Sequence, residues 1–265
     1  MTEHRIIEGA NGLRYVHPKV VASNDGTIYV ACHSLEMVDL GKYEYDLWLT
    51  RKMPANPSFN PAVSVVSTEG VIEAYPSLVP APSGGVYLAY SSDASSPNGI
   101  YFSRNTTGTF TAPVLVTASD AYQPSLAVAI NGNILATYFN KGDGTYSDIF
   151  LRISTDEGDT WGSTTAISDS QIAWQIAPQV STTLDGDVHV CWHEENDEGW
   201  PLRVLYREFV TSQGWQEIIE ISDFGAFPSM AGDSLSHIHL VYEMLTPAEP
   251  PDEPNYEIWY RSSVP

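Results

Sequence analysis

The sequence predicts an all-β protein, a single five-bladed β-propeller of four-stranded antiparallel blades, from three observations. A short proline-containing phrase recurs five times, each copy is followed by a turn and further strand-like segments, and helical periodicity is absent. With 265 residues, 43% of them hydrophobic, the chain can bury the core of one large domain. The alternative fold, a β-sandwich, predicts neither five similar units nor a divided last unit.

The recurring phrase consists of any residue, a proline, a small or polar residue and an aliphatic residue. Its copies begin 48 to 58 residues apart, a spacing that suits one four-stranded blade. The five prolines are Pro18, Pro76, Pro124, Pro178 and Pro228. Five phrases therefore predict five blades.

A tight turn follows each phrase and leads to a second strand. Turns such as Asn24-Asp25-Gly26 and Asp185-Gly186-Asp187 supply the positive φ that hairpins need. The second strand ends on an aromatic residue in four repeats and on Cys32 in the first. A third strand follows in every repeat and is closed by an arginine. These arginines are Arg51, Arg104, Arg152, Arg207 and Arg261.

The fifth repeat has no fourth strand of its own before the sequence ends. His4–Glu8 reads like Gln216–Glu220, which we expect to form the fourth strand of repeat four. We therefore expect residues 3–9 to complete the last blade and close the ring, because closure hides sheet edges. The predicted blades span about residues 13–67, 71–118, 120–169, 174–222, and 225–265 together with 3–9.

The segment Ser154–Trp161 reads S-x-D-x-G-x-T-W and falls between the predicted third and fourth strands of repeat three. With the five-fold repeat, it resembles the Asp box of the sialidase-like (bacterial neuraminidase repeat, BNR) β-propeller superfamily, over essentially the whole chain. The resemblance implies a structural motif on the rim opposite the substrate face, with an aspartate that accepts hydrogen bonds and a packed tryptophan. Its residues are Ser154, Asp156, Gly158, Thr160 and Trp161.

Sialidases of this superfamily hold a carboxylate with three arginines, which bind it bidentately. Five of the eight arginines here are the repeat-closing ones, and a residue repeated in every blade favours a structural role. The family's arginine two residues before the phrase proline is absent from all five repeats, and Arg14, four residues before Pro18, is a poor fit. The resemblance therefore predicts the fold without the sialidase arginine triad.

Five-bladed hydrolases resembling arabinanases place catalytic carboxylates at the starts of their inner strands. No carboxylate directly precedes a phrase proline in this chain. Glu73 and Asp120 lie a few residues upstream of Pro76 and Pro124, so a divergent glycoside hydrolase, of the sialidase-like or the five-bladed type, stays open.

In a propeller, the starts of the first strands and the loops after the second strands share one face around the channel, where ligands bind by default. Aromatic faces stack on sugar C–H groups, while amides and imidazoles bond to hydroxyls. The alternative is that these side chains only plug a narrow channel. The predicted ligand-binding residues are His17, His33, Tyr75, Gln123, Trp174, Gln175, His193 and Phe227.

Acidic loops on the same face, residues 193–201 and 243–256, carry oxygen ligands that suit Ca²⁺. No spacing matches a calcium loop, so the sequence predicts no cofactor, with Ca²⁺ kept as an option. His17, His33 and His193 offer zinc ligands, although a histidine pair without metal is the favoured interpretation. Two cysteines in this pattern predict two buried free thiols rather than a disulfide framework.

The chain has 12 basic and 33 acidic residues, and its net charge of −21 repels nucleic acid and anionic membranes. No run of 18 apolar residues occurs, so we expect no membrane insertion. The first hypothesis is a non-catalytic recognition module, extracellular or on a cell surface, that binds a glycan or a protein partner. Since Met1–His4 does not begin a signal peptide, this location requires that a leader was removed. The alternatives are the divergent hydrolase and a structural subunit of a surface assembly.

Overall fold

The computed structural model describes residues 6–7, 13–39, 42–94, 98–140, 146–246 and 255–263. Within these ranges the protein is all-β, with five antiparallel sheets, and no helix that is long and apolar enough to cross a membrane. The predicted fold class is confirmed: the sheets are the blades of a five-bladed β-propeller. The chain divides into two compact units, Met1–Pro124 and Ser125–Pro265.

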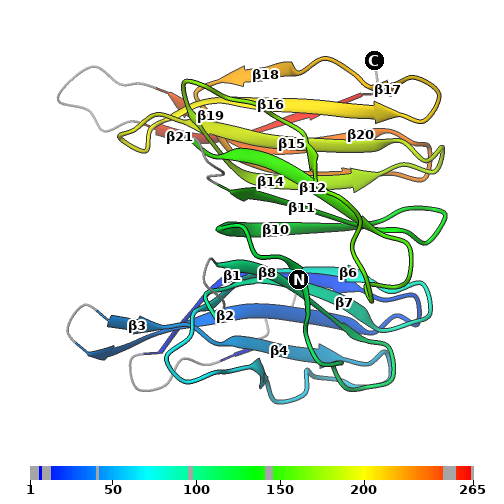
Figure 1. Cartoon of the computed structure of the whole chain (residues 1–265). Helices are drawn as coiled ribbons and strands as arrows, with labels where there is room; N and C mark the ends of the chain where they lie inside the picture. Colours follow the sequence, from blue (N-terminus) through cyan, green and yellow to red (C-terminus); the bar gives the residue numbers. More distant parts are fainter. Residues whose placement is uncertain are drawn as a thin grey trace. The chain divides into compact units, whose positions relative to one another are not determined.

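The first sheet lies in the first unit and has the order β1-β2-β4-β5, with β3 paired to the far end of β2 (Figure 1). Strand β2 runs well beyond the predicted second strand, which gives this blade an extra arm. The strands are β1 (Arg14–Ala22), β2 (Ile28–Asp39), β3 (Lys42–Glu44), β4 (Leu47–Lys52) and β5 (Val63–Val66).

The second sheet has the order β6-β7-β8-β9 and also lies in the first unit. Every residue of its second strand is buried, which suits the apolar segment Val86–Tyr90, and the two serines that follow are buried as well. The strands are β6 (Glu73–Pro80), β7 (Val86–Ser92), β8 (Gly99–Asn105) and β9 (Val114–Thr117).

The third and fourth sheets have the orders β10-β11-β12-β13 and β14-β15-β16-β17, and β18 also pairs with β16. Their outermost pairings are short, because β13 and β17 have only two residues each. The third sheet consists of β10 (Ala121–Val128), β11 (Ile134–Asn140), β12 (Asp148–Ser154) and β13 (Thr165–Ala166). The fourth consists of β14 (Trp174–Thr182), β15 (Val188–Glu195), β16 (Pro201–Val210), β17 (Gly214–Trp215) and β18 (Ile219–Asp223).

The fifth sheet contains three strands within the described residues: β19 (Gly225–Gly232), β20 (Ile238–Thr246) and β21 (Asn255–Ser262). Seven of the eight residues of β21 are exposed, including Ile258 and Trp259. The segment predicted to complete this blade, residues 3–9, lies outside the described residues except for Ile6 and Ile7. Its pairing therefore stays a prediction, and so do the blade boundaries.

The proline phrase has a common backbone geometry in all five blades. The residue before each proline adopts a positive φ between 46° and 56°. In four blades the register of the ladder shifts across the phrase, as in a β-bulge. Proline suits this position because a bulge interrupts the ladder where a missing N–H costs little. The bulge turns the preceding side chain out of the sheet alternation. These side chains belong to His17, Tyr75, Gln123, Ala177 and Phe227.

Each unit has its own apolar clusters between sheets. In the first unit, Tyr29 and Leu49 pack with Val86 of the next sheet. In the second, Trp192 is fully buried beside Leu135 and Leu151. Both cysteines are buried free thiols, as predicted, and burial raises the pKa of Cys32 to about 11.

Candidate functional site

Two of the strained pre-proline residues are held by a histidine of the preceding blade. The backbone N–H of Tyr75 donates to His33 Nδ1 at 3.3 Å, and that of Phe227 donates to His193 Nδ1 at 3.3 Å. The backbone N–H of Gln123 donates to Ser91 Oγ at 2.9 Å in the same way. Each N–H would otherwise lack a ladder partner at the bulge, so these bonds offset part of the cost of a positive φ.

In the first unit, three rings gather around His33. His17 stacks on His33 with ring centroids 4.9 Å apart, and Tyr75 lies 5.0 Å from His17 and 5.4 Å from His33. Tyr45 contacts the same imidazole at 5.4 Å. His33 is only 1% exposed, and burial, followed by the neighbouring His17, lowers its pKa to about 4. The imidazole is therefore neutral at physiological pH, which leaves Nδ1 able to accept the Tyr75 N–H.

A pocket of about 240 Å³ opens beside Tyr75. Three tyrosines line it, together with an isoleucine, an alanine, two serines, an aspartate and an asparagine. The lining residues are Tyr45, Ile72, Ala74, Tyr75, Ser91, Ser92, Asp93, Asn98 and Tyr122. We call it the tyrosine pocket. All of its residues belong to the first unit.

Hydrogen bonds fix the polar side of the tyrosine pocket. Asn98 Nδ2 donates to the Tyr122 hydroxyl at 2.7 Å, and that hydroxyl donates to Asp120 Oδ1 at 2.7 Å. Burial, with Asp120 second, raises the pKa of Tyr122 to about 12, so the phenol stays neutral. Asp93 Oδ1 accepts the N–H of Ile72 at 2.6 Å. The pocket thus presents oriented amide and carboxylate oxygens beside aromatic faces.

Glu73 lies on β6 two residues before Tyr75, but it does not line the tyrosine pocket. Its side chain is 1% exposed, and Oε2 is buried with no hydrogen-bond partner among the described residues. Burial raises the pKa of Glu73 to about 7, against the lowering effect of hydrogen bonds from Thr68. This carboxyl group is half-protonated near neutral pH, a property of general acids that is also found in buried structural groups.

In the second unit, His193 is fully buried and Phe227 is 56% exposed, with ring centroids 4.9 Å apart. The Nε2 atom of His193 lies 3.1 Å from Glu195 Oε1. Since Nδ1 accepts from Phe227, Nε2 carries the proton and donates to this carboxylate. Both ring nitrogens are therefore engaged, and only Phe227 offers a face to a ligand.

Trp174 and Gln175 have different surroundings from each other. The Trp174 indole donates to Asp197 Oδ1 at 3.1 Å in a solvent-exposed hydrogen bond. Gln175 is buried, and its amide links the Trp192 indole N–H to the Glu194 carboxylate. Glu194 also pairs with Arg203. Gln175 therefore helps to hold Glu194 inside the blade, and it has no surface for a ligand.

The Ser154–Trp161 segment forms a closed hydrogen-bonded turn between β12 and β13. Asp156 accepts the N–H of Thr160 at 2.9 Å and its hydroxyl at 2.5 Å, which together lower the pKa of the carboxyl group. The Ser154 hydroxyl donates to Asp156 and accepts the N–H of Gly158 at 2.8 Å. These bonds are internal to the turn, as a structural motif requires, and Gly158 supplies a φ of 90°.

No group of three or more histidine, cysteine or acidic side chains among the described residues is placed to hold a metal ion. His17 and His33 stack face to face. The acidic residues 249–253, to which the calcium option partly referred, lie outside the described ranges.

Tyr75 is the one lining residue of the tyrosine pocket that the sequence predicted as ligand-binding, and the residues that were not predicted include Tyr45, Asn98 and Tyr122. The notable signal for Tyr122 was its place directly before Gln123, the first residue of the proline phrase. Tyr45 and Asn98 lie in segments of irregular length, which carry no repeat signal. Only the packing of neighbouring blades brings them to Tyr75.

Comparison with solved structures supports the fold. A protein of unknown function from Dyadobacter fermentans matches 90% of this chain and 77% of its own, with 15% identity and a TM-score of 0.70. The intramolecular trans-sialidase from Ruminococcus gnavus matches 95% and 85%, with 8% identity and a TM-score of 0.66. An α-L-arabinanase from Penicillium chrysogenum matches 87% and 77%, with 15% identity and a TM-score of 0.62.

No family model and no curated protein sequence matches the chain. The fold and the site together define a β-propeller that has the fold of sialidases and arabinanases and an aromatic pocket at the start of its second blade. At these identities the likeness shows the fold alone.

Proposed function

We propose that this protein is a non-catalytic recognition module that binds a glycan through the tyrosine pocket. One observation carries the proposal: Tyr45, Tyr75 and Tyr122 surround a small pocket whose polar rim holds Asn98 and Asp93. Tyrosine faces stack on the C–H face of a sugar, while amide and carboxylate oxygens accept its hydroxyls. The volume of about 240 Å³ suits one terminal sugar residue rather than a long chain.

The choice of an uncharged glycan follows from the electrostatics of the pocket. Its charged lining residue is Asp93, and Asp120 lies behind Tyr122. The net charge of −21 adds a repulsive field for anionic sugars. Neutral hexoses or pentoses are therefore the preferred ligands. The fold is shared with a trans-sialidase solved with oseltamivir carboxylate and an arabinanase solved with arabinobiose, and this likeness supports a carbohydrate ligand.

The proposal includes an extracellular or cell-surface location, where glycans are displayed. A protein partner on the same face, or a structural role in a surface assembly, is a competing outcome. A glycan array followed by calorimetry with the best saccharide separates glycan recognition from these two alternatives, because only glycan recognition requires saturable binding of free sugar.

Tyr75→Ala should weaken binding of that saccharide by at least ten-fold, since it removes one stacking face. Tyr256→Ala is the matched control, because this tyrosine is exposed in β21 and lies outside the pocket. No binding to any arrayed saccharide, or equal binding by Tyr75→Ala, would count against the proposal.

A second candidate, a divergent glycoside hydrolase, is favoured by Glu73 alone. Its raised pKa suits a general acid, and Asp93 and Asp120 lie at or beside the adjoining pocket. Burial of Glu73 opposes this role, because a general acid must reach the glycosidic oxygen. Aryl glycosides of neutral sugars test this second candidate. Hydrolysis that is abolished in Glu73→Gln would show that the protein is a glycoside hydrolase. Sugar binding without any hydrolysis would favour the recognition module.

A further inference from the structure

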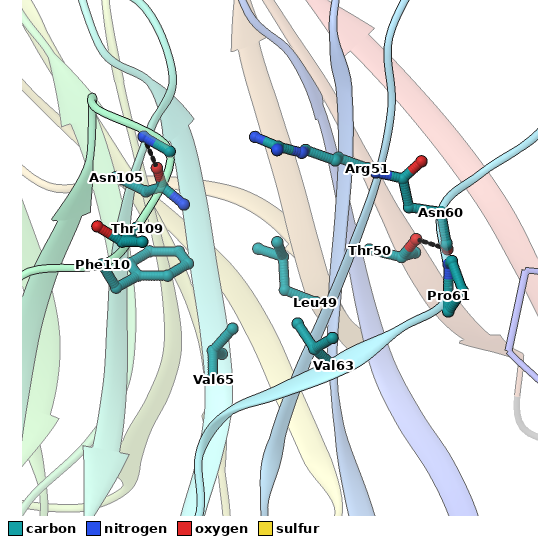
Figure 2. A pocket seen from close by; sticks show the side chains of 11 residues that line it. Leu49, Thr50, Arg51, Asn60, Pro61, Val63, Val65, Asn105, Thr109 and Phe110 are labelled. Atoms are coloured by element: carbon teal, nitrogen blue, oxygen red, sulfur yellow. Dashed lines mark hydrogen bonds between the residues drawn. The ribbon is translucent and has the colours of Figure 1, made fainter. Parts of the chain in front are cut away.

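A second pocket of about 380 Å³ lies in the first unit and shares no lining residue with the tyrosine pocket. Figure 2 shows it between strands β4 and β5 on one side and the loop that follows β8 on the other. Its floor and walls are apolar, formed by Leu49, Val63, Val65 and Phe110. Its volume falls in the range of small-molecule sites.

Among the lining residues of this pocket the one charged side chain is Arg51, and none of them is acidic. The Arg51 side chain extends across the opening towards Asn105 (Figure 2). Asn105 Oδ1 accepts the N–H of Gly108 at 2.9 Å, which leaves the amide nitrogen for a ligand. A guanidinium and an amide N–H at the mouth of an apolar cavity form a receptor for an anion.

The Arg51 side chain differs from two of the other repeat-closing arginines, Arg207 and Arg152. Arg207 donates to the carbonyl groups of Gln216 and Ile167 at 2.8 and 2.7 Å and lies over Trp215. Arg152 donates to Thr164 Oγ1 at 2.9 Å. Within the described residues, the Arg51 guanidinium forms neither a hydrogen bond nor an ion pair. The same sequence position is thus used for packing in two blades and left available in the first.

We propose that this pocket binds a small monocarboxylate with an apolar body. The carboxylate pairs with the fork of Arg51 and with Asn105, while the body lies against Phe110, Leu49 and Val65. We expect a ligand with a single negative charge, because the protein's net charge of −21 repels polyanions. The Arg51 guanidinium is sufficient to balance one carboxylate. The neutral amide of the same shape lacks the charge that Arg51 recognises.

The test uses the whole protein with benzoate, hexanoate and, as the neutral isostere, benzamide. Calorimetry should detect a carboxylate that binds at least ten-fold more tightly than benzamide. Amide shifts in ¹H–¹⁵N spectra should concentrate on residues 49–51 and 105–110. Arg51→Gln should weaken the preferred carboxylate at least ten-fold, and Arg152→Gln, at the equivalent position of another blade, should leave its affinity unchanged.

Val63→Trp provides a second variant, because this exposed residue of β5 lines the pocket and a larger side chain fills it. It should abolish binding while the melting temperature stays close to that of the wild type. The proposal is overturned if neither carboxylate binds, if benzamide binds equally well, if Arg51→Gln retains full affinity, or if the shifts map elsewhere.

Discussion

The regions around Tyr75 and Phe227 share one backbone design and differ in what surrounds it. Both residues precede a proline at a bulge, have φ values of 56° and 46°, and donate their N–H to a histidine Nδ1 at 3.3 Å. Around Tyr75 the histidine meets other rings and a pocket opens beside it. Around Phe227 the histidine pairs with Glu195, and the phenylalanine stands exposed. The sequence repeat therefore determines the backbone geometry of the bulge, whereas the surrounding side chains determine whether a pocket forms beside it.

The position two residues before the aromatic shows the same contrast. In the first region it holds Glu73, whose carboxyl group is buried. In the second it holds Gly225, where an added Cβ would lie 2.3 Å from Ser222 Oγ and 2.7 Å from Val204 Cγ2. The first region has room for a side chain that the second excludes by packing.

The largest expected effect is that of Glu73→Gln on stability at alkaline pH. Because the folded pKa is raised to about 7, the stability that this carboxyl group contributes is fully present below pH 4.5 and is lost as the pH rises to 7. Glutamine keeps the volume and cannot ionise, so the variant should be more stable at pH 8 by up to about 3 kcal/mol. Urea unfolding at pH 4 and pH 8 measures this. Glu69→Gln, at an exposed site, is the control, and a difference independent of pH would refute the burial argument.

His33→Asn should alter the pH dependence of the free energy of unfolding at acidic pH, with a sign opposite to that of Glu73→Gln. The folded pKa of about 4 lies below the unfolded value of 6.5, so the unfolded state binds more protons between these values. Stability contributed by neutral His33 is therefore present above pH 6.5 and is lost as the pH falls to 4, by up to about 3 kcal/mol. The asparagine variant should lack this rise, so its stability relative to the wild type should fall as the pH increases from 4 to 6.5, measured by urea unfolding of both proteins at half-unit steps. An unchanged slope would contradict the shift.

Gly225→Ala should destabilise the second region by about 1–3 kcal/mol, because the new methyl group overlaps Ser222 and Val204. Thermal unfolding followed by circular dichroism measures the loss. Removal of the nearest atom in the double variant Gly225→Ala/Ser222→Ala should recover part of it. If Gly225→Ala is as stable as the wild type, the two regions differ less in packing than the Cβ distances to Ser222 and Val204 indicate.

The smallest effect concerns the strained residues themselves. Glycine relieves a positive φ that costs a side-chain-bearing residue about 1 kcal/mol, and Phe227 is mostly exposed. Phe227→Gly should therefore raise the free energy of unfolding by about 0.5 kcal/mol. Tyr75→Gly should lower it, because Tyr75 packs on His17 and His33. Matched urea curves compare the two, and equal effects would remove the distinction between the regions.

Much of the fold was readable from the sequence, because its signals are local. The five proline phrases mark bulges, and turns such as Asn24-Asp25-Gly26 give the positive φ of their glycines. The strand segments are short and rich in β-branched and aromatic residues. The two-residue outer strands β13 and β17 and the arm of β2 and β3 were not readable, since they depend on pairing across the sheet rather than on local preference.

The candidate site could be predicted only in part, because its residues come together through contacts that are distant in the sequence. Tyr75 and His33 were predicted ligand-binding residues, and the structure brings them together with His17. Gln175 has an equally suitable side chain by sequence, yet it is buried against Trp192 and Glu194. Whether an amide faces a ligand or a neighbouring strand depends on residues far apart along the chain.

By itself the sequence determined the repeated backbone: a bulged first strand, a tight turn, and strands closed by an arginine. Only the tertiary structure decided which copies of these features become available to ligands, as with Tyr75 against Phe227 and Arg51 against Arg207. Backbone geometry follows from φ preferences and hydrogen bonds within a few residues. Exposure and free hydrogen-bonding capacity follow from what the neighbouring blade places opposite each side chain.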